Sequence, residues 1–195
     1  PIKIFKDEVY ATNFQENYNL ISNPFSWSKI YNSSWLRKNN IKFGNQYLGE
    51  DKIFTWTSYL KAETIVISPE IMYQHKFYYG SRNRMTHVNL KSAESLITID
   101  ENIRDIFKSY QLIDLYNSRL INRDILQIIL GKDGLLKLRK NTEIFEVFDL
   151  LSNWLNFLAN QTKNLGNIVS PNLSKQYEHL LAKEAEKYVH HVLSN

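Results

Sequence analysis

Hydrophobic and polar residues alternate in several segments of the first half of the chain, which is the pattern of half-buried β-strands. The segment Lys52–Ser68 (KIFTWTSYLKAETIVIS) is rich in β-branched and aromatic residues, and Phe54, Trp56 and Leu60 alternate with polar positions. Pro69 marks the end of this segment, because proline cannot continue a strand ladder. The pattern therefore predicts a strand-rich region here.

A β-hairpin is predicted over residues 72–91. Apolar and aromatic side chains alternate along residues 73–79 and again along residues 86–91, and Gly80 to Asn83 between them is turn chemistry. The hairpin places Arg82 and Arg84 at its tip. Three further apolar positions are expected to extend the sheet, namely Leu96, Ile97 and Ile99.

The apolar period lengthens to three or four residues in the second half, which is typical of amphipathic helices. Asp100 or Asn102 is predicted to cap the first of these helices. The clearest helical stripe lies within Thr142–Lys163, and Ser170-Pro171 is a start signal for a last helix. Shorter helical patterns cover Phe25–Asn39 and Asn122–Leu130.

These elements together predict an α+β fold in one domain, residues 1–195. An antiparallel, β-rich N-terminal half (about residues 1–99) is expected to pack against an all-helical C-terminal half (about residues 101–193). The 195 residues and the 43% of apolar residues are sufficient for a packed core.

Positive charge is concentrated in two segments that contain no acidic residue, Ser28–Gly49 and Ile71–Ala93, called the basic windows below. Each window holds four lysines or arginines and several aromatic rings, although the net charge of the whole chain is only +4. Cations that neutralise phosphates and rings that stack on bases are the elements of single-strand or RNA recognition. The candidate nucleic-acid-binding residues are Arg37, Lys38, Lys42, Lys76, Tyr78, Tyr79, Arg82, Arg84, His87 and Lys91.

Composition excludes some classes of function. The chain contains no cysteine, so disulfides, thiol catalysis and cysteine-ligated metal sites are excluded. The sequence shows no apolar run of membrane-spanning length and no signal-peptide pattern, so we expect the cytoplasm or the interior of an organelle and no membrane partner. Abundant Asn, Lys, Ile, Tyr and Phe are typical of an AT-rich genome.

Two weaker patterns point to chemistry. Arg82 and His87 have the residue types for metal-independent RNA cleavage, in which imidazole moves a proton and guanidinium stabilises charge on phosphorus. Glu186 and His190 lie one helical turn apart and are suited to share a metal ion, but the neighbouring sequence does not complete a set of ligands. We therefore predict neither a metal nor a cofactor, and assign no catalytic residue.

The segment KSAESLITID (Lys91–Asp100) resembles a strand-to-helix passage in chorismate-lyase-like proteins. The resemblance implies an antiparallel sheet flanked by helices and an enzyme that removes pyruvate from chorismate. Where that family has a substrate-binding arginine on the preceding strand, this sequence has Gln74, His75 and Lys76. The late strand with a glutamate is missing, because the last third of the chain has a helical pattern.

The sequence thus favours a small basic protein that binds nucleic acid through the hairpin tip and an aromatic, basic patch. One alternative is a small-molecule enzyme of chorismate-lyase-like type, with His75 and Lys76 binding an anionic substrate. Another is a subunit of a homo-oligomer or larger assembly, with exposed rings such as Trp27 and Trp35 at a protein interface.

Overall fold

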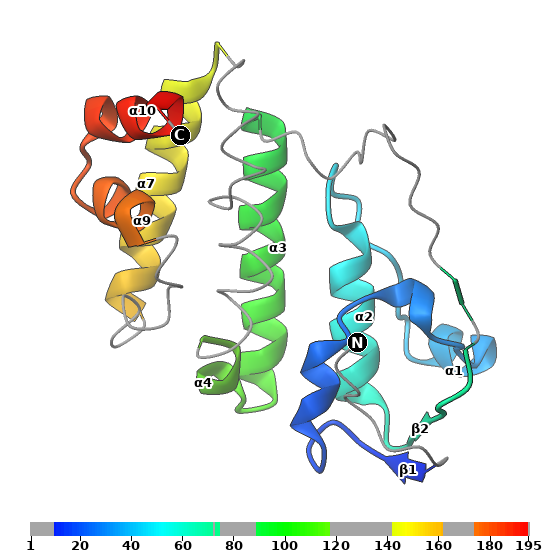
Figure 1. The fold of residues 1–195 in the computed structure, drawn as a ribbon. Coiled ribbons are helices and arrows are strands. Elements are labelled where there is room, and N and C mark those ends of the chain that lie inside the picture. Colours follow the sequence, from blue (N-terminus) through cyan, green and yellow to red (C-terminus); the bar gives the residue numbers. More distant parts are fainter. Residues whose placement is uncertain (1–9, 72, 75–88, 118–141, 162–173, 195) are drawn as a thin grey trace. The chain divides into compact units, whose positions relative to one another are not determined.

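The computed structural model describes residues 10–71, 73–74, 89–117, 142–161 and 174–194 (Figure 1). Within these ranges 63% of the residues are helical and 5% belong to strands, which form a single two-stranded sheet. The predicted α+β class with a β-rich N-terminal half (1–99) is therefore wrong. Every helix in the described part of the chain is too short or too polar to span a lipid bilayer.

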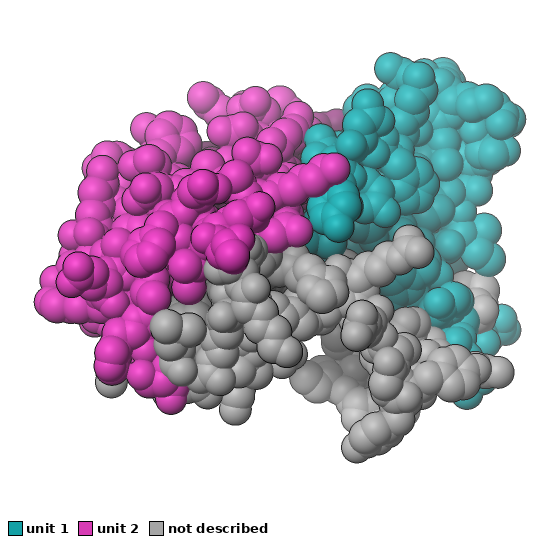
Figure 2. All heavy atoms as spheres, turned by 90° about the horizontal axis from the view of Figure 1, so that it is seen from above, with its two compact units in different colours: residues 1–81 teal, residues 82–195 magenta. Residues whose placement is uncertain are grey.

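The chain divides into two compact units, residues 1–81 (unit 1) and residues 82–195 (unit 2), which Figure 2 colours teal and magenta. The boundary between the units falls inside the second basic window but not inside the first. The first window lies wholly in unit 1, whereas the second is divided, so that Lys91 belongs to unit 2. The expectation of one domain stays a prediction.

Unit 1 contains two short strands and four helices in its described residues. Strand β1 (Tyr10–Thr12) pairs antiparallel with β2 (Ile65–Ile67), with Tyr10 opposite Ile67. The helices are the 3-10 helices η1 (Tyr18–Ser22) and η2 (Ser26–Ser28), and the α-helices α1 (Ser33–Lys38) and α2 (Glu50–Lys61).

Helix α2 replaces most of the strand predicted over Lys52–Ser68, and only Ile65–Ile67 of that prediction is a strand. Acidic residues in the first turn and Lys61 in the last turn match the helix dipole, and Gly49 precedes the helix with a φ of 74° that favours glycine. The helix is buried on most sides. Its apolar positions therefore lack a clear period, and their alternation imitates a strand.

The core of unit 1 forms around α2 from aromatic side chains. Trp56 is fully buried, and its ring centroid lies 6.1 Å from that of Phe14 and 5.7 Å from that of Tyr59. Leu20 and Leu60 are also buried. This arrangement fixes α2 against the irregular segments that carry the exposed rings described below.

Unit 2 is helical in its described residues. Helix α7 (Ile144–Gln161) packs against α3 (Leu90–Ser109) and against α9 (Ser174–Leu181), and α10 (Ala185–Ser194) packs against both α7 and α9 (Figure 1). The short helix α4 (Ile113–Leu115) follows α3. The helix predicted within Thr142–Lys163 is confirmed as α7.

Two other helix predictions for unit 2 are corrected. The single last helix predicted after Ser170-Pro171 is two helices in the described residues, α9 and α10, because Lys183 between them adopts a left-handed backbone with a φ of 55°. Residues 122–130, predicted as a helix, lie outside the described residues. So does the C-terminal stop expected beyond α7.

Helix α3 begins at Leu90, ten residues before the predicted cap at Asp100. Asn89 and Ser92 form a capping box, in which each side chain accepts a hydrogen bond from the backbone N–H of the other. A carboxylate oxygen of Glu143 also accepts from the backbone N–H of Leu90 at 3.1 Å. The helix continues from this start because Ala93, Leu96, Ile99, Ile103 and Phe107 form a fully buried stripe at helical spacing.

This start overturns three expectations for residues 90–100. Leu96, Ile97 and Ile99 do not extend a sheet, and the predicted return strand cannot include Leu90 and Lys91. The passage from strand to helix within Lys91–Asp100 is also wrong, because all ten residues are helical. The resemblance to chorismate-lyase-like proteins depended on that passage, so these ten residues do not support the fold that it implied.

Candidate functional site

The loop that leads into and through η2 carries two exposed aromatic rings. Pro24 is buried, and Phe25 continues the chain in an extended conformation with φ −89° and ψ 131°. Because Phe25 is extended, the helix predicted over Phe25–Asn39 does not begin at this residue. Of that prediction only α1 and the single turn η2 are helical.

Phe25 and Trp27 stack on one another, and Tyr73 lies tilted against Trp27; we call these three rings the ring surface. The Phe25 and Trp27 centroids lie 4.9 Å apart with planes inclined by 25°, and those of Trp27 and Tyr73 lie 4.7 Å apart with planes inclined by 39°. The three residues are 40%, 44% and 48% exposed, respectively. Exposed aromatic area of this kind is typical of binding surfaces, because its transfer out of water on binding lowers the free energy.

Exposed apolar side chains are concentrated in unit 1. Of the large hydrophobic residues that are exposed in the described chain, nine belong to unit 1 and two, Phe145 and Phe157, to unit 2. Phe43 is one of the nine; its ring stacks on that of Phe54 at 4.3 Å with planes 7° apart. Phe43 directly follows Lys42, so a ring and a cation lie side by side in the first basic window.

The three candidate cations of unit 1 lie at and just after the end of α1. The side chain of Asn32 caps this helix by accepting hydrogen bonds from the backbone N–H groups of Ser34 and Trp35 at 3.0 and 3.1 Å. Arg37 and Lys38 occupy the last turn, where positive charge matches the helix dipole, and both are exposed, as is Lys42. The structure thus presents Arg37, Lys38 and Lys42 to solvent within one short segment.

Of the other predicted site residues, the structure describes one, Lys91. Lys91 is exposed in the first turn of α3, in unit 2. The remaining six lie outside the described residues: Lys76, Tyr78, Tyr79, Arg82, Arg84 and His87. His75, which the enzymatic alternative invoked together with Lys76, lies outside them as well.

Lys29 is the one cation of the first basic window that the structure half-buries. Its ammonium donates to the backbone oxygen of Asn23 at 2.9 Å, to the Asn23 side-chain oxygen at 3.3 Å and to the backbone oxygen of Phe25. It also lies 5.0 Å from the ring centroid of Tyr59, a cation–π distance. Burial lowers the pKa of Lys29 to about 8, against the opposing charge of Asp51.

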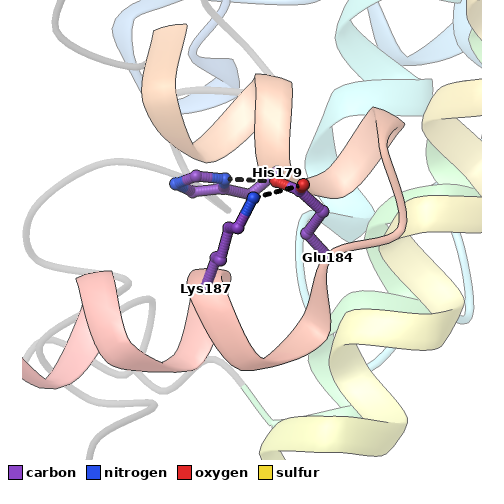
Figure 3. A network of polar contacts seen from close by, with 3 residues as sticks. All are labelled: His179, Glu184 and Lys187. Carbon is purple, nitrogen blue, oxygen red and sulfur yellow. Dashed lines mark hydrogen bonds and ion pairs between the residues drawn. The ribbon is translucent and has the colours of Figure 1, made fainter.

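A second cluster of titratable groups lies on α9 and α10 of unit 2 (Figure 3). Glu184 directly precedes α10, and its carboxylate contacts His179 Nδ1 at 3.2 Å and accepts a hydrogen bond from Lys187 at 2.6 Å. These two contacts lower the pKa of Glu184, with Lys187 the larger cause. Beside them is an open hollow of about 830 Å³, lined by three histidines, Lys187, Ser194 and two glutamates.

This hollow contains Glu186 and His190, the pair that the sequence suggested for a shared metal. In the described residues no group of three or more His, Asp or Glu side chains is placed to hold a metal ion. The rings of His179 and His191 are 6.2 Å apart and tilted by 59°. We therefore interpret the contacts of Glu184 with His179 and Lys187 as a solvent-exposed polar network that joins α9 and α10.

A third polar cluster is closed to ligands. Asp100 is fully buried in α3 and accepts hydrogen bonds from the Tyr116 hydroxyl and, at 3.1 Å, from the indole N–H of Trp154 on α7. Arg104 instead donates to Asn117 at 2.6 Å. Burial raises the pKa of Asp100 to about 6, although both hydrogen bonds and the charge of Arg104 act in the opposite direction.

Comparison with protein-family models, with curated proteins and with solved structures gives no match for this chain. The candidate function is therefore argued from the geometry of the described residues alone. The sequence predicts Arg37, Lys38 and Lys42, and it predicts Trp27 and Trp35 as exposed rings, of which Trp35 is instead half-buried. It does not predict the contact of Tyr73 with Trp27, which joins positions far apart in the sequence and leaves no local signal.

Proposed function

We propose that unit 1 binds single-stranded nucleic acid, with bases stacking on the ring surface and with Arg37, Lys38 and Lys42 neutralising phosphates. The observation that carries this proposal is the contact among the rings of Phe25, Trp27 and Tyr73, because all three rings are partly exposed although unit 1 has an aromatic core. Bases in a single strand have free faces for such rings, whereas bases in a duplex are already stacked on one another.

The geometry limits how bases can bind. Phe25 stacks on Trp27, and Tyr73 lies tilted by 39° against Trp27, so a base would contact the outer face of Phe25 or the exposed part of the Trp27 ring. Each base that stacks on an aromatic side chain contributes about 1–3 kcal/mol by alanine substitution. We therefore expect a small site that holds one or two bases, with modest affinity and little sequence preference.

Replacing Trp27 with alanine is expected to weaken the binding of a short fluorescein-labelled oligodeoxyadenylate about 5- to 150-fold, since 1–3 kcal/mol corresponds to that range. The measurement is fluorescence anisotropy at low salt, with the matching duplex as the competitor. Phe157→Ala is the matched control, because Phe157 is 51% exposed but lies in unit 2. Equal affinities for single strand and duplex, or equal effects of the two substitutions, would contradict the proposal.

The same assay tests the cations. Changing Arg37, Lys38 and Lys42 together to glutamine is expected to reduce the slope of log K against log salt by about 2, because a single strand releases about 0.7 counterions per neutralised phosphate. Absence of any binding below about 10 µM at low salt would remove the nucleic-acid proposal altogether.

Three exposed aliphatic side chains favour a second candidate function, that of a subunit in an assembly. Ile30, Val66 and Ile71 of unit 1 are 81%, 65% and 90% exposed. Aliphatic groups offer no face for a base, but they are buried readily at protein interfaces. Sedimentation velocity is expected to show a mass that rises with concentration, and Ile71→Lys to reduce it; a constant monomer mass would exclude self-assembly.

A further inference from the structure

We propose that Lys29 is the positioning residue of the ring surface: its ammonium holds the backbone of the loop Asn23–Ser28, and loss of its charge releases the stacked rings of Phe25 and Trp27. The effect on the rings follows from contacts within unit 1. Its consequence for ligand binding rests on the function proposed above.

The ammonium of Lys29 contacts three residues of the ring-bearing loop, namely Asn23, Phe25 and Ser28. The backbone oxygen of Asn23 and the backbone oxygen of Phe25 both accept from its ammonium, the first at 2.9 Å. The hydroxyl of Ser28 lies 3.4 Å away, and it donates in turn to the Asn23 side-chain oxygen at 2.8 Å. One cation therefore links the start, the middle and the end of the loop.

The rest of the loop is joined to α2 by weaker or neutral contacts. The Tyr59 hydroxyl donates to the backbone oxygen of Asn23 at 3.0 Å, and the Ser26 hydroxyl donates to Asp51 at 3.3 Å. The loop contributes one turn of 3-10 helix, η2, which contains no buried residue. Because the loop has little burial of its own at η2, its charged hydrogen bonds weigh heavily on the position of Trp27.

Charge is essential to this role. An ammonium group has three N–H donors and no acceptor, so it can face several oxygen atoms at once. A neutral amine has one donor fewer and directs a lone pair at one of these oxygens, which repels it. Deprotonation therefore removes at least one contact and weakens the others, and acylation of the amine would do the same.

The groups that face Lys29 decide the pH at which this occurs. Asp51 and Tyr59 face it from α2, and Tyr31 interacts with both of these residues. Burial raises the pKa of Tyr31 to about 12 and that of Tyr59 further, so both phenols stay protonated up to about pH 10. With its lowered pKa, Lys29 is the member of this cluster that changes charge near pH 8.

The test uses the full chain labelled with 5-fluorotryptophan, which gives fluorine NMR signals for its 4 tryptophans; loss of one signal in Trp27→Phe assigns Trp27. Between about pH 6.5 and about pH 9.5 we expect the Trp27 signal of the native chain to shift with a midpoint near 8. Lys29→Met should hold it near the high-pH position throughout. Lys29→Arg, which stays charged, should hold it near the low-pH position.

A Trp27 signal that is independent of pH in the native chain, or that titrates equally in Lys29→Met, would overturn the inference. The Trp154 signal serves as the internal control, because Trp154 lies in unit 2. A merely structural lysine would also let Lys29→Arg and Lys29→Met behave alike. The difference between these two variants is therefore the specific readout.

A binding arm separates this inference from the proposed function. Oligodeoxyadenylate is the probe, because adenine does not titrate in this range, and its Kd is expected to rise at least about 5-fold from pH 7 to pH 9 for the native chain but not for Lys29→Arg. If the Trp27 signal titrates as expected but no oligonucleotide binds, the proposed function fails and the positioning role of Lys29 stands. If the oligonucleotide binds with a pH-independent Kd in the native chain, the proposed effect of the Lys29 charge on ligand binding is overturned.

Discussion

The free energy of unfolding of unit 2 is expected to fall by about 2 kcal/mol between pH 4 and pH 7 through Asp100, and Asp100→Asn is expected to remove this loss. The pKa of this carboxyl is raised by burial from 3.8 to about 6 in the folded state. Between these two values the folded state keeps a proton that the unfolded state has released. The contribution of Asp100 to the free energy of unfolding is therefore greatest below its unfolded pKa. It declines by up to about 1.4 kcal/mol for each pH unit and is lost as the pH rises through the folded pKa.

The arrangement around Asp100 explains why its partners do not cancel the cost of burial. Tyr116 and Trp154 donate neutral hydrogen bonds, and the guanidinium of Arg104 is directed to Asn117 at 2.6 Å. A buried carboxylate without a directly paired cation favours its protonated form. Burial therefore favours the protonated acid more in this network than it is favoured in water, which is the direction of the pKa shift.

Hydrogen exchange of the amides in α3 and α7, followed by mass spectrometry at several pH values, measures this effect. Asp105→Asn is the matched control, because Asp105 is an exposed carboxylate of the same helix and the substitution removes the same charge. The control should keep the decline in protection. An unchanged pH slope in Asp100→Asn would show that another group is responsible.

The helices of unit 2 were predictable where one side of the helix alone is buried. In α7 the residues Ile144, Phe148, Leu151, Leu155 and Leu158 are buried, and the spacing of these residues predicts the helix and places its start within two residues. The periodicity of the hydrophobic effect along one face was sufficient there. No tertiary information was needed.

The start of α3 was misread because its polar residues are buried. Ser92, Ser95 and Asp100 lie in the core, and the polarity of Asp100 predicts a helix cap there although the helix begins ten residues earlier. The true start signal, Asn89 with Ser92 three residues later, was present in the sequence. It lacked the usual glutamate or glutamine at the second position, so it did not stand out.

The candidate site was predictable only in part, for a different reason. Exposure of Arg37, Lys38 and Lys42 follows from their polarity, so the sequence could name them. Whether a tryptophan is core or surface depends on contacts between distant segments, which a local pattern does not contain. Trp27 and Trp56 have similar surroundings in sequence, each flanked by serine or threonine, yet one is 44% exposed and the other is fully buried.

This contrast gives the second large prediction. Trp56→Ala is expected to lower the free energy of unfolding of unit 1 by about 3–5 kcal/mol, because it removes a fully buried ring and leaves a cavity beside Phe14 and Tyr59. Trp27→Ala is expected to cost about 1 kcal/mol or less, since its ring is already partly in water. Hydrogen exchange of the amides in α2 measures both changes.

The two tryptophans should then differ in the opposite sense for ligand binding. Trp27→Ala is expected to weaken oligonucleotide binding while the protection of α2 stays close to native, which separates a binding ring from a core ring. Trp56→Ala lowers binding only in proportion to the fraction of unit 1 that unfolds, so the loss should be recovered by a stabilising osmolyte that favours the folded state. Recovery of the Trp27→Ala defect by the same osmolyte would mean that Trp27 acts through stability, and the ring surface would lose its proposed role.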